Sequence, residues 1–313
     1  MRTARLVVLG AAMALAVLVV GPTAVAGAAP IGSGADHAVF VQTDDPTGNQ
    51  IVAYARAENG ELTPAGTYDT GGLGAVQTGA VVDPLASEGS LAYDGEHALL
   101  LAVNAGSDSV SVFGVDRAAL TLNQVVPSGG PFPSSIAVRG DLAYVLNAGG
   151  AGSVQGYRIQ GGKLHPIAGS SRSLGLSNAD VPFFTASPGQ VAFTPDGDQV
   201  VVTTKSHGTI DVFGVRPDGR LTAGVENPSA IPVPFAVAFD AAGHLVVANA
   251  GVSSVSTYGV NEDGTLSVIT TGAANGQAAT CWIVEARGFF YTGNAGSGTV
   301  STYRVDDDGQ ASL

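Results

Sequence analysis

Lys205 and His207 lie two positions apart in a polar turn of this sequence, and together they could perform hydrolytic chemistry. An imidazole can activate water as a general base, and an ammonium group can hold the oxyanion that forms when water attacks a carbonyl carbon. Arg172 offers a second cation for the oxyanion, and Asp44 or Asp180 offers a carboxylate to orient the base. We predict these five residues as the catalytic set. The alternative interpretation is a solvated polar turn.

No motif of a metal-dependent or cofactor-dependent enzyme accompanies these residues. The sequence contains no His-Glu-x-x-His, no phosphate-binding loop, no dinucleotide fingerprint and no Gly-x-Ser-x-Gly elbow. His37 and His165 have no partner at metal-ligand spacing, and no Asp-rich calcium loop is present. The single cysteine, Cys281, cannot form an internal disulfide bond. We therefore predict no metal and no cofactor.

A repeated β-hairpin must position the predicted catalytic residues. Its clearest copy is Leu245–Val260, in which an Asn-Ala-Gly triplet heads the turn between two strands. The asparagine of this triplet recurs at Asn104, Asn147, Asn249 and Asn294. We interpret it as a turn cap, with the glycine in the left-handed conformation. The alternative is a ring of channel-facing amides for substrate or, with Asp44 and Asp45, for a calcium ion.

Two further copies of the hairpin complete a set of six and depart from the asparagine pattern. The copy at Val39–Tyr54 has Thr43-Asp44-Asp45 at its turn, and the copy at Val200–Phe213 has Thr204-Lys205-Ser206-His207. The four regular copies are typical of a structural repeat. The two departures, which fall at one equivalent position, therefore indicate where function is to be sought.

Each repeat resolves into four short strands. In the fourth repeat these are Gln190–Thr194, Gln199–Thr204, Thr209–Val215 and an outer strand that begins at Arg220–Gly224. Apolar residues alternate with small or polar ones, and Gly, Asp and Asn mark the turns. Six phased copies predict an all-β propeller of four-stranded antiparallel blades with almost no helix. A β-sandwich is the competing fold, but it does not predict phased copies.

The two ends of the repeat predict a longer ring. The first copy begins at its second strand, and the sequence stops at Gly309–Leu313, early in the last outer strand. No closing strand is present, so we predict a propeller truncated at its C-terminus, with seven blades in the intact ring. The alternative is an open ring of six blades with an exposed edge, which natural sheets usually avoid.

The repeat lengthens at two places, Gly71–Gly89 and Pro166–Pro188. Both insertions connect an outer strand to the next inner strand. In a propeller that connection emerges on the same face as the turn between second and third strands, so both insertions should decorate one rim. Long loops on a rigid scaffold are where function usually lies.

The first 28 residues predict a secretory signal peptide. Arg2 and Arg5 precede an apolar run at Leu6–Val20, and small residues offer a cleavage site between Ala26 and Ala29. A membrane anchor is the alternative, but about 15 apolar residues are short for a span of about 20. We predict a secreted, extracellular protein with a propeller domain at 29–313 and no membrane span in the mature chain.

The charge of the mature chain excludes several partners. Without Arg2 and Arg5, the 13 basic residues fall to 11 against 26 acidic ones, a net charge of −15. Such a surface repels nucleic acid and anionic lipid, and it disfavours phosphorylated substrates.

The repeated Val-x-Asn-Ala-Gly-Ser-x-x-Val-Ser segment, followed by Asp-Gly-x-Leu, resembles the lactonase family of seven-bladed propellers over residues 38–313. That family includes bacterial 6-phosphogluconolactonases and fungal carboxymuconate cyclases, and YVTN-repeat propellers are similar. The resemblance implies a lactone hydrolase or a cycloisomerase. Family members that act as lactonases carry Pro-His pairs before some inner strands, where this sequence has Pro131-Phe132, Pro188-Gly189 and Pro234-Phe235.

Two functions follow as expectations. The first is a secreted, monomeric lactonase-like propeller that hydrolyses a neutral extracellular lactone by metal-independent acid–base chemistry at the channel mouth. The second is a non-catalytic extracellular propeller that binds a glycan or a protein partner.

Overall fold

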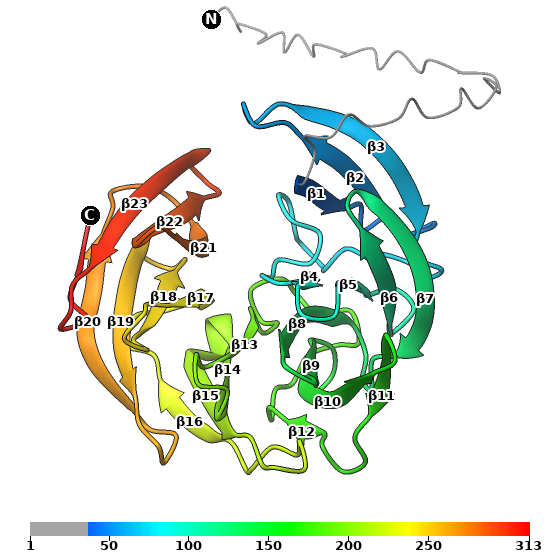
Figure 1. Ribbon diagram of the computed structural model, residues 1–313. Coiled ribbons are helices and arrows are strands. Elements are labelled where there is room, and N and C mark those ends of the chain that lie inside the picture. Colours follow the sequence, from blue (N-terminus) through cyan, green and yellow to red (C-terminus); the bar gives the residue numbers. More distant parts are fainter. Residues whose placement is uncertain (1–36) are drawn as a thin grey trace, which may run out of the picture. The chain divides into compact units, whose positions relative to one another are not determined.

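The computed structural model describes residues 37–313, which are built almost entirely of antiparallel strands (Figure 1). Within this part of the chain the single helical element is a short 3-10 turn, η1 (Lys205–His207). The predicted signal peptide, residues 1–28, lies outside the described residues, as do the first residues of the predicted propeller domain. No helix of the described residues is long and apolar enough to cross a membrane.

Strand pairing divides the described residues into six sheets that follow one another along the chain. Blade 1 contains β1 (His37–Gln42), β2 (Gln50–Arg56) and β3 (Leu62–Asp69). Blade 2 contains β4 (Leu91–Asp94), β5 (Leu99–Asn104), β6 (Ser109–Asp116) and β7 (Ala119–Pro127). Blade 3 contains β8 (Pro133–Arg139), β9 (Leu142–Asn147), β10 (Ser153–Gln160) and β11 (Lys163–Pro166), with β12 (Arg172–Ser173) paired to β10.

The other three blades have four strands each. Blade 4 contains β13 (Val191–Phe193), β14 (Gln199–Thr203), β15 (Thr209–Gly214) and β16 (Val225–Pro228). Blade 5 contains β17 (Pro234–Phe239), β18 (Leu245–Asn249), β19 (Ser254–Val260) and β20 (Leu266–Ala274). Blade 6 contains β21 (Thr280–Ala286), β22 (Phe289–Asn294), β23 (Thr299–Val305) and β24 (Ala311–Ser312).

These sheets confirm the predicted propeller with six blade repeats. Blade 1 has three strands, as expected of a copy that begins at its second strand. Inner strands of successive blades lie against one another, β4 beside β8, β8 beside β13 and β17 beside β21, so the sheets fan around a common centre (Figure 1). The seventh blade and the C-terminal truncation stay predictions.

The core lies between the faces of neighbouring blades. Strands β5 and β18 are buried along their whole length, because each sheet is covered on both sides. A tyrosine near the end of the third strand ties blade 3 and blade 6 to the preceding blade. Tyr157 Oη donates to Pro127 O at 2.6 Å, and Tyr303 Oη donates to Ala273 O at 3.1 Å.

One boundary differs from the sequence-based expectation. The outer strand of blade 4 begins at Val225, five residues later than predicted, and Leu221 makes only an isolated bridge to Val215. The backbone N–H of Gly214 donates to the hydroxyl of Thr222 at 2.9 Å, so a side chain replaces the regular ladder there.

The repeated asparagines are structural, as predicted, but they bond across the hairpin instead of capping its turn. Asn104 Nδ2 donates to the hydroxyl of Ser111 at 2.8 Å, and Asn249 Nδ2 donates to Ser256 at the same distance. Asn294 Nδ2 donates to Ser301 at 2.9 Å. All three amides are buried and bond the third strand of their own hairpin instead of facing the channel.

The expected role of the glycine in this triplet was wrong. Gly106 has no left-handed backbone, whereas Asp108, two positions later, has a φ of 49°. A Cβ on Gly106 would lie 2.2 Å from the carbonyl oxygen of Gly74. The glycine therefore allows the preceding connection to pass close to the hairpin, and Gly149 plays the same part against Asp180 O at 2.4 Å.

Candidate functional site

The two long insertions meet on one rim of the propeller, which confirms their predicted placement. Thr78 of the first insertion and Phe183 of the second form a parallel bridge. Thr78 N donates to Pro182 O, and Phe184 N donates to Thr78 O, each at 3.0 Å. The insertions thus stabilise each other although about 100 residues separate them in the chain.

The first insertion, residues 71–89, reaches across this rim to three blades. Ser87 Oγ donates to Ser134 O of blade 3 at 2.7 Å, and the backbone N–H of Glu88 donates to Gly189 O, just before blade 4, at 3.0 Å. Trp282 Nε1 of blade 6 donates to Ser87 O at 3.1 Å. A segment bonded to blades on different sides of the ring spans its centre, so residues 71–89 cover the channel mouth.

Lys205 lies beneath this insertion. Its side chain is 1% exposed, its Nζ donates to Ala86 O at 2.7 Å, and the same atom stands 5.1 Å from the centre of the Phe235 ring. Within residues 37–313, no carboxylate oxygen lies within 4 Å of Nζ. Burial therefore lowers the pKa of Lys205 to about 7, although the charges of Asp83 and Cys281 act in the opposite direction.

Asp44 occupies the corresponding turn of blade 1. It is 9% exposed, and its Oδ1 accepts a hydrogen bond from Gln42 Nε2. Burial raises the pKa of Asp44 to about 6, the hydrogen bond from Gln42 opposes that shift, and the charge of Asp83 adds to it. A buried carboxyl that is poised near neutral pH is suited to accept a proton.

Asp44 and Lys205 hold one equivalent position of the repeat, the position that the regular copies fill with alanine, as at Ala105 and Ala295. Both have left-handed backbones, with φ of 54° at Asp44 and 49° at Lys205, whereas the alanines do not. A non-glycine residue in this conformation is strained by about 1–3 kcal/mol, and such strain concentrates at functional sites. The two copies that break the repeat therefore differ in backbone as well as in side chain.

Asp83 of the first insertion links these two positions electrostatically. Burial is the main cause of the raised pKa of Asp44 and Glu88 and of the lowered pKa of Lys205. The negative charge of Asp83 adds to the first two shifts and opposes the third, so it lies within electrostatic reach of all three groups. Its carboxylate accepts hydrogen bonds from the backbone N–H groups of Leu85 at 2.9 Å and Ser87 at 3.1 Å. Those bonds fix the Asp83 carboxylate within electrostatic reach of two other carboxyl groups and one buried amine.

A cavity of about 220 Å³ opens beside this cluster. Its walls are apolar apart from Asp83, and they come from both insertions and from blades 5 and 6; the main side chains are Val82, Ala86, Phe184, Phe235, Cys281 and Trp282. The rings of Phe235 and Trp282 meet edge to face at 5.9 Å. The cavity, Asp83, Asp44 and Lys205 make up the site that we call the rim site.

The structure brings only some of the predicted catalytic residues to the rim site. Lys205 and Asp44 belong to it. His207 is exposed, and its charge acts on Asp211 of β15. Arg172 directs its guanidinium to the backbone carbonyls of four residues, among them Thr222 at 2.9 Å, and Asp180 is exposed.

Three contributors to the rim site were missed from sequence. Asp83 and Glu88 lie in an insertion that the spacing of the repeat had already singled out, so its acidic residues were the available signal. Trp282 lies in β21, where it lines the cavity and donates a hydrogen bond to the first insertion.

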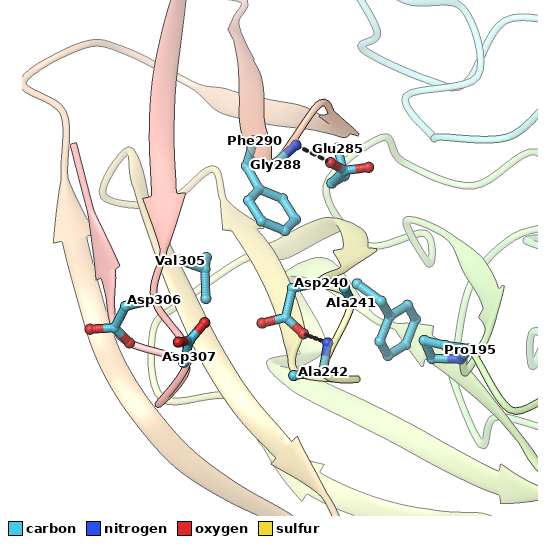
Figure 2. A pocket seen from close by; sticks show the side chains of 11 residues that line it. Pro195, Asp240, Ala241, Ala242, Glu285, Gly288, Phe290, Val305, Asp306 and Asp307 are labelled. Carbon is cyan, nitrogen blue, oxygen red and sulfur yellow. Dashed lines mark hydrogen bonds between the residues drawn. The ribbon is translucent and has the colours of Figure 1, made fainter.

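A larger cavity of about 750 Å³ lies on the opposite rim (Figure 2). Two of its carboxylates complete local turns: Glu285 accepts from Gly288 N at 2.7 Å, and Asp240 accepts from Ala242 N at 3.0 Å. Asp240 also pairs with His244 at 2.7 Å. These acids are explained by the turns between strands, so size alone does not make this cavity the better candidate.

No group of three or more His, Cys, Asp or Glu side chains within residues 37–313 is arranged to hold a metal ion. The carboxylates of the rim site influence one another through their charges without converging on one point.

Three solved structures share the fold of this chain. A protein from Lactobacillus plantarum has a TM-score of 0.70 at 18% identity, over 89% of this chain and 81% of that one. A periplasmic gluconolactonase of Pseudomonas aeruginosa has a TM-score of 0.66 at 18% identity, over 88% and 81%. A protein of Bacteroides uniformis, provisionally named a 6-phosphogluconolactonase, has a TM-score of 0.63 at 15% identity, over 88% and 79%.

These neighbours confirm the lactonase-like propeller fold that the sequence resemblance implied. At such low identity the likeness concerns the fold, and one propeller scaffold supports many functions. No family model matches the chain, and no curated protein matches it.

Proposed function

We propose that this protein hydrolyses an uncharged lactone at the rim site. One observation carries the proposal: Asp83 lines an apolar cavity on the insertion-bearing rim of a lactonase-like fold, and the lining residues Ala86 and Phe235 also contact the buried amine of Lys205. The net charge of −13 for the full sequence repels anionic substrates, and the apolar walls disfavour a phosphosugar.

The proposed mechanism uses side chains alone. Asp83 accepts a proton from a water molecule that attacks the lactone carbonyl. The negative charge of Asp44 favours this proton transfer. Protonated Lys205 has three N–H donors, of which one bonds Ala86 O, so another is free to stabilise the oxyanion. Collapse of the tetrahedral intermediate breaks the ring C–O bond, and the leaving alkoxide takes up the proton that Asp83 accepted, which restores the carboxylate.

The test is a hydrolysis assay on purified protein with γ- and δ-lactones that bear alkyl substituents. Lys205→Met and Asp83→Asn should each lower kcat by about 100-fold, since one oxyanion donor or one general base is worth that much. Lys163→Met and Asp116→Asn are matched controls because both positions are exposed and lie in blade strands away from the rim site. Unchanged turnover in both rim-site variants would overturn the proposal.

His207→Ala decides between the two candidate bases. Retained turnover supports Asp83, whereas a comparable loss supports the imidazole that the sequence first suggested. Insensitivity of turnover to a chelator would support the metal-independent mechanism.

The second candidate is a binding propeller without catalysis, and the nearly apolar lining of the cavity favours it. Trp282 is the sole tryptophan of the sequence and lines the cavity, so its fluorescence reports occupancy directly. A lactone that changes this fluorescence and is recovered intact would support binding without hydrolysis. Secretion, inferred from residues 1–28, is tested by sequencing the N-terminus of exported protein.

A further inference from the structure

Lys205 combines deep burial with a lack of any ion-pair partner. It is 1% exposed, and within the described residues no carboxylate approaches its Nζ to 4 Å. The charged groups that act on it are Asp83 from the first insertion and Cys281 from β21. Burial outweighs both and brings the pKa of Lys205 to about 7, so much of the amine is neutral at neutral pH.

A neutral amine in this setting has a free lone pair. It carries two N–H groups, and one of them donates to Ala86 O at 2.7 Å. The lone pair is then available for attack, as in enzymes whose lysine is activated by an apolar pocket. The Phe235 ring, 5.1 Å from Nζ, supplies part of that apolar environment.

Residues that contact this amine also line the cavity of the rim site. Ala86, Phe235 and Cys281 line the cavity, and each of them also touches Lys205 or acts on it. At about 220 Å³ the cavity lies below the range of roughly 300–1,000 Å³ that holds drug-sized ligands, so it suits a small molecule. Its apolar walls favour an uncharged one, and Asp83 at its edge can exchange protons.

The backbone of Lys205 and that of its hydrogen-bond partner Ala86 both adopt the left-handed conformation, which is unfavourable for residues other than glycine. Lys205 has a φ of 49°, and its partner Ala86 has a φ of 43°. The alanines at the equivalent repeat position adopt ordinary backbone angles, and two of the regular turns place their left-handed residue later, at Asp108 and Ser253. Strain at two hydrogen-bonded residues, together with a buried unpaired amine, points to a chemical role for that amine.

We propose that Lys205 forms a reversible imine with a small apolar aldehyde or ketone bound in the cavity of the rim site. The neutral Nζ adds to the carbonyl carbon and gives a carbinolamine. Asp83 carries the proton from nitrogen to the departing hydroxyl, which leaves as water, and the C=N bond forms. Water adds back to release the carbonyl compound, so the cycle needs no oxidant or reductant. This activity is separate from lactone hydrolysis, although both use Lys205.

The sequence offers a clean test because it contains only two lysines, Lys163 and Lys205. Lys163 lies exposed at the start of β11 and serves as the internal reference. The full-length protein is incubated with hexanal and sodium cyanoborohydride, which reduces any imine to a stable secondary amine. Peptide mass mapping then gives the extent of alkylation at each lysine and at the N-terminus.

Hexanal at pH 7 should alkylate Lys205 at least about 10-fold faster than Lys163. Each unit by which the pKa of a lysine is lowered raises its fraction of neutral amine about tenfold at a pH below that pKa. Polar glycolaldehyde should show a much smaller preference, and Lys205→Arg should abolish the fast site. Alkylation at Lys205 should increase as pH rises through about 7 and then level off.

Equal alkylation of the two lysines, or no alkylation of Lys205 at any pH from 6 to about 9, would overturn the proposal. A change in Trp282 fluorescence with hexanal, but without a trapped adduct, would also count against the imine, since it indicates binding alone. An adduct at Lys205 in wild-type protein that turns over no lactone would support this proposal without the proposed function, and lactone turnover without an adduct would do the reverse.

Discussion

Lys205 Nζ and the carbonyl oxygen of Ala86 are joined at 2.7 Å across 119 residues of sequence. The bond connects the turn of blade 4 to the insertion that follows blade 1, and it is made beneath that insertion. It therefore makes the rim site a product of tertiary structure: neither the turn nor the insertion would place the amine beside Asp83 and the cavity by itself.

Lys205→Met should stabilise the folded protein near neutral pH. The folded pKa of Lys205, about 7, lies below its usual value of 10.5, so between these limits the unfolded chain binds more protons. Stability of the wild type should therefore rise with pH over this window, and the desolvation penalty should be largest below pH 7. The variant also loses the hydrogen bond to Ala86. We therefore expect its free energy of unfolding to exceed that of the wild type by about 2 kcal/mol at pH 6, and this difference should shrink towards pH 10.

Denaturant unfolding of both proteins across that pH range measures the effect. Lys163→Met, which changes an exposed lysine, should leave the pH profile unaltered. Parallel profiles for the wild type and Lys205→Met would show that the amine is not desolvated.

Asp44→Asn should also stabilise the protein, but in a different pH window. The folded pKa of Asp44, about 6, lies above its usual 3.8, so between these values the folded chain binds more protons. Wild-type stability should then fall as pH rises from about 4 to 6, and the full penalty applies above pH 6. The variant keeps an oxygen for Gln42, lacks this fall, and should gain up to about 2–3 kcal/mol at pH 7. A variant no more stable than the wild type at pH 7 would contradict the buried charge.

The propeller scaffold could be predicted from the sequence because its β-hairpin repeat occurs six times. A hairpin with Asn104 bonded to Ser111 reappears with Asn249 bonded to Ser256, so each copy reinforces the interpretation of the others. The same repetition placed both insertions on one rim, since the direction of each strand fixes where its connection emerges.

The rim site could be predicted only in part. Departure from the repeat identified Asp44 and Lys205, because a repeat shows which position is free to vary. His207 followed the same logic, yet the short turn at Lys205–His207 leaves the imidazole exposed while the amine is buried. Asp83 was not predicted because the first insertion has no second copy for comparison. The path of that insertion across three blades depends on long-range hydrogen bonds.

Gly74→Ala should displace the first insertion from the rim. A Cβ at this position would lie 2.1 Å from the backbone carbonyl of Asp44, which the hairpin holds in place. The insertion must therefore move away, with an expected loss of about 1–3 kcal/mol in stability and most of any rim-site activity. Gly48→Ala is the matched control, because a Cβ there meets nothing within 4 Å. Thermal unfolding and turnover should separate the two variants, and equal behaviour would indicate an insertion that is not seated on the turn.

Arg172→Met should reduce stability without changing turnover per folded molecule. The guanidinium donates to four backbone carbonyl groups. Those of Leu221 and Thr222 join the second insertion to the start of the outer segment of blade 4, and the other two lie within the insertion itself. Hydrogen bonds from a charged donor contribute about 1.5–3 kcal/mol each, and partial hydration of the freed carbonyls should limit the total loss to about 2–3 kcal/mol. Arg56→Met removes an exposed arginine at the end of β2 and should have little effect. If kcat for lactone hydrolysis fell while the unfolding midpoint stayed constant, Arg172 would be an oxyanion partner after all, because a purely structural cation cannot lower the rate of the chemical step in the folded protein.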